Sequence, residues 1–106
     1  MSKHLKPLDD LFASELRDPE FARDYLQLAL EENGPEGFFF ALQKVAAANR
    51  SMSKVATEAG VGRESLYRSL SEQGNPSFRT IYAALRTLGM ELRVDEVKAS
   101  SPSSLP

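Results

Sequence analysis

The segment Met52–Leu70, MSKVATEAGVGRESLYRSL, constrains the fold more than any other part of the chain. Ala56, Gly60 and Leu66 stand at relative positions 0, 4 and 10 within it. A small residue lets two helices cross closely, a glycine four residues later permits a positive φ at the turn, and an apolar residue then anchors the second helix. This spacing predicts a helix-turn-helix. Further positions expected to face inward are Val55, Ala59 and Val61.

The outward face of the second helix is predicted to contact DNA. Arginine can donate two hydrogen bonds to guanine, glutamate can accept from cytosine, and tyrosine can meet a phosphate or a thymine methyl group. Basic side chains and hydroxyls near helix N-termini can fix the register on phosphates. The candidate DNA-binding residues are Arg63, Glu64, Tyr67, Arg68, Ser53, Lys54, Ser77 and Arg79. The alternative to DNA binding is a plain helical hairpin with a solvated charged face. For Glu64 and Arg68 the alternative role is a surface ion pair between residues four positions apart.

Charge is divided unevenly along the chain. Residues 1–36 hold nine acids and four bases, a net of −5, whereas residues 37–106 hold six acids and nine bases, a net of +3. Such asymmetry indicates two different partners. The basic part can meet phosphate, and the acidic part suits a basic protein.

Size and composition exclude several classes of protein. The 106 residues allow one modest core. There is no cysteine, and the single histidine, His4, is expected to be solvated, so a zinc site is not expected. No phosphate loop or nucleophile motif is present. We therefore expect no enzyme, catalytic residue, metal or cofactor. Because there is neither a long apolar run nor a signal peptide, we also expect a cytoplasmic protein.

Local signals place helices on both sides of the helix-turn-helix. Asp18-Pro19-Glu20 predicts a helix start, and Asn33-Gly34 predicts its end, so an acidic N-terminal helix should span 18–33. Pro35 should open a second helix that ends near Asn49. Ser77 should cap a last helix ending near Leu88. The residues expected on its inward face are Phe78, Ile81, Tyr82, Leu85 and Leu88.

The two ends of the chain are less regular. Residues 1–17 could form a short helix or an extended arm. Met90–Val94 alternates apolar and charged residues, which predicts a short strand. Residues 96–106 are predicted to be a disordered tail. The domain should therefore cover 18–95, with the helix-turn-helix at 52–71.

A family resemblance rests on RESLYRSL, the following GNPSF and the final LRTLGMELRV, with DYLQLALEE and an apolar helix before them. Over roughly 18–95 the chain resembles the probable addiction-module antidote proteins, a branch of the Cro/repressor-like (XRE-type) helix-turn-helix antitoxins. The resemblance implies a five-helix DNA-binding domain that works beside a small RelE/ParE-like toxin. The family commonly has serine where Gly62 stands, and many relatives of the wider class have glutamine where Met52 stands.

These observations predict an all-α, five-helix Cro/repressor-like helix-turn-helix domain with a short C-terminal β-strand. Its expected function is an antitoxin that binds an inverted-repeat operator in double-stranded DNA as a homodimer and represses its own operon. The expected toxin contacts are Phe21, Asp24, Leu28, Glu31 and Glu32, and the expected dimer contacts are Met90, Leu92 and Val94. The alternatives are a stand-alone repressor without a toxin and a protein-interaction module that does not bind DNA.

Overall fold

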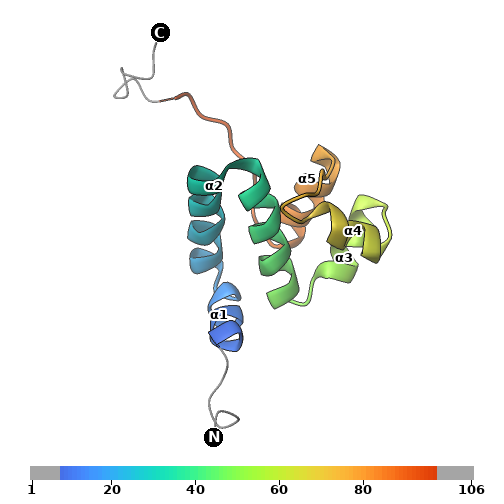
Figure 1. Ribbon diagram of the computed structural model, residues 1–106, viewed down its shortest axis with the longest axis horizontal. Helices are drawn as coiled ribbons and strands as arrows, with labels where there is room; N and C mark the ends of the chain where they lie inside the picture. Colours follow the sequence, from blue (N-terminus) through green and yellow to red (C-terminus); the bar gives the residue numbers. More distant parts are fainter. Residues whose placement is uncertain (1–7, 98–106) are drawn as a thin grey trace, which may run out of the picture.

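The protein is all-α over residues 8–97, the part of the chain that the computed structural model describes (Figure 1). His4 and most of the expected tail lie outside the described residues. Within them the chain forms five helices in the order α1 Leu8–Leu16, α2 Pro19–Ala48, α3 Met52–Ala59, α4 Arg63–Ser69 and α5 Phe78–Thr87. None of these helices is long and apolar enough to cross a membrane.

The long helix α2 is kinked at Gly34 into two helical halves. Asp18 caps its start, as predicted, because its carboxylate accepts a hydrogen bond from the backbone N–H of Phe21 at 3.3 Å. Gly34 has φ 72° and ψ −165°, a backbone conformation that essentially only glycine adopts, and Pro35 follows it. The second half therefore turns back beside the first, and Figure 1 shows the two halves side by side. The predicted break between the two helices is confirmed.

Over Leu8–Leu16, the part of the first 17 residues that forms a described helix, the chain adopts the short helix α1. This helix packs on the first half of α2, where the ring of Phe12 makes edge contacts with Phe21 and Tyr25 at centroid distances of 6.0 and 5.1 Å. Burial in this contact raises the pKa of Tyr25 above its ordinary value of 10.0. The side chain of Arg17 also donates to the backbone oxygen of Ala48 at 3.1 Å. The end of α1 is thereby tied to the end of α2.

Helices α3 and α4 and the turn between them lie at the predicted positions. Gly60 ends α3 with φ 75° and ψ 31°, the left-handed conformation that the spacing required. The predicted inward residues Val55, Ala56, Ala59 and Leu66 are buried. Val61 is an exception: it is 39% exposed, because it occupies the turn itself rather than the inner face of either helix.

The buried face of α5 differs from the prediction. Phe78 and Tyr82 were expected inside, yet they are 64% and 51% exposed and stack on each other with their centroids 6.5 Å apart. Ile81, Leu85 and Leu88 do pack on the core, as predicted. The other buried positions of α5 are Thr80, Ala83 and Ala84. Small side chains let α5 and α3 approach closely, and the aromatic rings remain outside.

The predicted strand at Met90–Val94 is wrong. Among residues 8–97 no strand is present, and the segment after α5 continues without regular structure. A strand needs a neighbouring segment for its backbone hydrogen bonds, and none of the described residues supplies one. At the start of this segment the backbone N–H of Met90 donates a hydrogen bond to the backbone oxygen of Leu85 at 2.8 Å.

Candidate nucleic-acid interface

Helix α4 is held to the core by two leucines and exposes the rest of its surface. Leu66 and Leu70 are fully buried, four residues apart on one face. The candidate DNA-binding residues on this helix, Arg63, Glu64, Tyr67 and Arg68, are all exposed. Since a helix that packs through one face presents the opposite face to solvent, α4 can offer these side chains to a groove of DNA.

Contacts within α4 order the arginines without neutralising them. The guanidinium carbon of Arg63 lies 5.9 Å from the centre of the Tyr67 ring, and Arg68 donates to Ser65 Oγ at 3.3 Å. The ion pairs of the described residues are Arg23–Asp24 and Arg93–Glu91. The surface ion pair between Glu64 and Arg68, which was the alternative to DNA contact for these two residues, is not among them.

The remaining candidate DNA-binding residues lie near the starts of α3 and α5. They differ in whether their side chains are free to contact a phosphate. Ser53, Lys54 and Arg79 are exposed. Ser77 is exposed too, but its Oγ accepts from the backbone N–H of Thr80 at 3.1 Å and contacts Thr80 Oγ1 at the same distance. Because capping of α5 occupies this hydroxyl, Ser77 is the weakest of the predicted phosphate contacts.

The predicted toxin contacts form a stripe along the first half of α2. Asp24, Leu28, Glu31 and Glu32 are exposed. Leu28 follows Asp24 by four residues, and Glu31 and Glu32 follow Leu28 by three and four, so all four lie on one broad face of the helix. Asp24 accepts from Arg23, and Glu31 accepts from Gln27 at 2.8 Å. Phe21 is half-buried against Phe12, so it serves the internal packing of α1 on α2.

The three predicted dimer contacts also differ in their exposure to solvent. Met90 is half-buried and packs on the core, whereas Leu92 is 45% and Val94 is 94% exposed. Val97, further along the same segment, is also exposed. The segment that follows α5 thus carries apolar side chains that no described part of the same chain covers.

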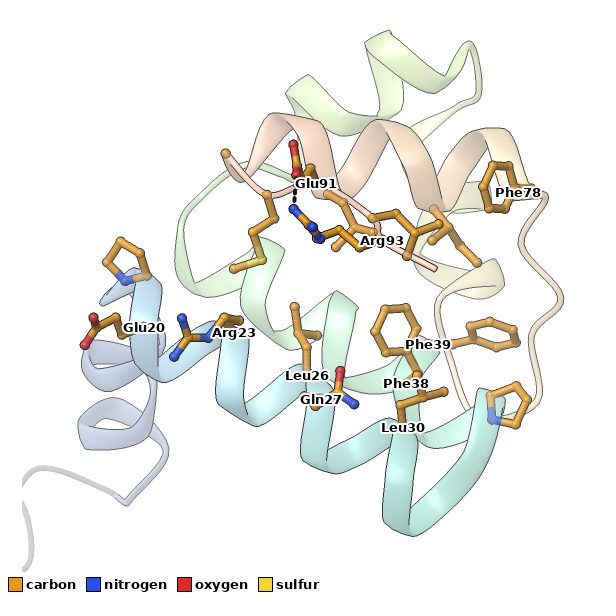
Figure 2. A pocket seen from close by; sticks show the side chains of 17 residues that line it. Glu20, Arg23, Leu26, Gln27, Leu30, Phe38, Phe39, Phe78, Glu91 and Arg93 are labelled. Carbon is orange, nitrogen blue, oxygen red and sulfur yellow. Dashed lines mark hydrogen bonds and ion pairs between the residues drawn. The ribbon is translucent and has the colours of Figure 1, made fainter. Parts of the chain in front are cut away.

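A groove that sequence reasoning missed lies between α2, α5 and the segment after α5 (Figure 2). Its volume is about 750 Å³. Figure 2 shows three phenylalanines at one end and charged residues near the other. These residues are Phe38, Phe39, Phe78, Glu20, Arg23 and Arg93. The available sequence signal is the run of three phenylalanines at 38–40, since one buried face of a helix cannot cover three consecutive residues.

Comparison with known proteins identifies relatives over almost the whole chain. A family model described as probable addiction module antidote protein matches residues 5–96. An uncharacterized protein of Haemophilus influenzae is 36% identical over 96 residues, which cover 91% of this chain and 96% of the relative. No solved structure matches.

Proposed function

Because this chain belongs to the family of probable addiction module antidote proteins, we propose that it is a DNA-binding antidote. In this proposal it binds the operator of its own operon through the helix-turn-helix formed by α3 and α4. It represses that operon and neutralises a RelE/ParE-like toxin. The observation that carries the DNA-binding part is the exposed face of α4, with two arginines and a tyrosine opposite two fully buried leucines.

The chemistry of this face favours DNA over a partner protein. Arg63 and Arg68 can each donate two parallel hydrogen bonds to a guanine or bind a phosphate. Lys54 on α3 and Arg79 on α5 add positive charge that can meet the phosphate backbone of DNA. Both lie within residues 37–106, which carry a net charge of +3. Arginine and tyrosine are also enriched at protein interfaces, so this surrounding positive charge is what favours DNA.

The toxin contact is proposed on the acidic stripe of Asp24, Leu28, Glu31 and Glu32. A toxin that binds nucleic acid needs a basic surface. Exposed carboxylates on this chain would complement the charge of that surface and raise the rate of association between the two proteins. Leu28 adds an apolar contact at the middle of the stripe, since it is 52% exposed. The stripe belongs to α2, and α4 is a separate element, so one protein could engage toxin and DNA through different helices.

A two-fold dimer is proposed for operator binding, because one recognition helix reads only a few base pairs. Leu92 and Val94 are the proposed contacts between the two copies, through their exposed side chains. The operator would then be an inverted repeat with half-sites about 34 Å apart, which is one turn of DNA.

The DNA-binding function is tested by gel shift with the protein's own promoter. Arg63→Ala and Arg68→Ala should each weaken binding by about 1–3 kcal/mol for a base contact. Arg23→Ala is the matched control, since it removes an exposed arginine from α2. A base contact should relax specificity at one position, whereas a phosphate contact should lower the affinity for all sequences and flatten the salt dependence.

If both variants bind as tightly as the wild type and melt normally, α4 is not the recognition helix. If operator binding is normal but no toxin co-purifies when the neighbouring genes are co-expressed, the stand-alone repressor is the correct alternative.

A further inference from the structure

Helix α4 has only seven residues: Leu66 O accepts from the backbone N–H of Leu70 at 2.9 Å, and the carbonyl groups after Leu66 have no backbone partner within the helix. Two serines next to them supply local donors: Ser69 Oγ donates to Leu66 O at 3.0 Å, and Ser71 Oγ donates to Arg68 O at 2.8 Å. These bonds finish the helix, but they do not fix its direction relative to the rest of the fold.

A third donor comes from another helix. The side-chain nitrogen Nε2 of Gln43, in the second half of α2, donates to Tyr67 O at 3.1 Å and to Leu70 O at 2.5 Å. One amide group thus uses both of its hydrogens on the end of α4. The bonds cross 24 and 27 residues of sequence, whereas the serine bonds cross only three.

The leucines of α4 cannot replace this contact. Leu66 and Leu70 hold the helix down through apolar packing, which has no preferred direction. Hydrogen bonds do have one, and they weaken steeply outside a narrow range of distance and angle. A helix of seven residues is about 10 Å long, so a tilt of about 10° would displace one end by about 2 Å. That displacement exceeds the tolerance of a hydrogen bond to a base edge.

We propose that Gln43 is a positioning residue, whose amide ties the end of α4 to α2 and so fixes the direction in which the arginines of α4 project. The proposal rests on the DNA-binding function proposed above. Gln43 itself need not touch DNA, because it acts on the backbone of α4 from the side of the core.

The test compares Gln43→Met with Gln27→Met. Methionine keeps the length and removes both donors, and Gln27 is a matched control because its amide bonds only Glu31 within the first half of α2. We expect the operator Kd of Gln43→Met to rise about ten-fold, and that of Gln27→Met to stay near the wild-type value. Gln43→Glu should lose more affinity than Gln43→Met, because a carboxylate would face two carbonyl oxygens.

Amide hydrogen exchange supplies a readout that does not need DNA. In Gln43→Met the amides of α4 should exchange faster, while those of α2, α3 and α5 keep wild-type protection. Unchanged operator affinity, or faster exchange over the whole domain, would overturn the proposal. If the wild type itself fails to bind its operator, the proposed function fails. The tie between Gln43 and α4 is then judged by exchange alone: a change confined to α4 supports it, and its absence overturns it.

Discussion

The guanidinium carbon of Arg63 lies 5.9 Å from the centre of the Tyr67 ring, one helical turn further along α4. A cation over an aromatic ring at an exposed site contributes about 0.5–1 kcal/mol. The contact restricts the Arg63 side chain, so less side-chain entropy would be lost in the proposed binding to DNA.

Replacement of Tyr67 should separate the role of its ring from that of its hydroxyl. Tyr67→Phe keeps the ring over Arg63 and should bind the operator nearly as well as the wild type. Tyr67→Leu removes the ring and should weaken binding by about 1 kcal/mol. Fluorescence anisotropy with operator DNA measures both. A loss of the same size in both variants would show instead that the hydroxyl contacts a phosphate.

Gly62→Ser should stabilise the protein. Gly62 is the N-cap of α4, with φ −73° and ψ 155°, and it makes no side-chain capping bond. A Cβ at this position would meet no atom within 4 Å, so a serine fits without strain. A serine cap and the reduced freedom of the unfolded chain together should add about 1 kcal/mol to the free energy of unfolding. Urea denaturation measures the gain; Gly62→Ala, which lacks the hydroxyl, isolates the contribution of the cap.

Charge reversal of Asp24, Glu31 and Glu32 should abolish toxin binding and leave operator binding intact. All three side chains are exposed, so their charges contribute little to folding. The largest change is expected in the association rate at low salt, measured by surface plasmon resonance with the toxin. Unchanged affinity and rate would remove the acidic stripe from the toxin interface and point to the groove between α2 and α5.

The double variant Leu92→Asp, Val94→Asp should be monomeric if the segment after α5 joins two copies. Light scattering coupled to size exclusion should then give the mass of one chain, and footprinting should protect a single half-site. Val97→Asp is the control, because Val97 is exposed on the same segment but lies outside the proposed contact. A dimer that survives the double substitution would place the two-fold contact elsewhere.

Alkaline pH should destabilise the fold through Tyr25. Its pKa is raised by burial, so the folded protein retains this proton to higher pH than the unfolded chain. The folded state then binds more protons above about pH 10, and the free energy of unfolding falls as the pH rises through that region. Tyr25→Phe should reduce the decline while leaving stability at neutral pH nearly unchanged. Denaturation curves at a series of alkaline pH values test this, and an identical decline in the variant would contradict it.

Features of the fold that depend on a few adjacent residues were predicted well from the sequence. Asp18 and Ser77 cap helices where their side chains can reach a backbone N–H three residues ahead, which is a local geometry. The break at Gly34 was predicted from the pair Asn33-Gly34, which ends a helix, and from Pro35, which begins the next one. The face of α4 was also predictable, because Leu66 and Leu70 fix which side is buried.

Features that depend on distant parts of the chain were not predictable. The strand at Met90–Val94 was inferred from alternation, but alternation cannot supply the neighbour that a strand requires. Phe78 and Tyr82 were placed inside on hydrophobicity, whereas close packing of α5 on α3 is made by alanines. The bonds from Gln43 to α4 carry no sequence signal, since they join residues at least 24 positions apart.

The break at Gly34 has a consequence for how this chain tolerates mutation. Gly60 adopts the left-handed helical conformation, which asparagine also reaches at modest cost, and nothing lies within 4 Å of a Cβ built there. Gly34 has a similar φ but an extended ψ, and that combination is closed to every other residue type. In a library of single-residue variants, asparagine should therefore survive at position 60 and be lost at position 34. The turn of the helical hairpin, which carries none of the proposed DNA contacts, is then among the least replaceable points of the molecule.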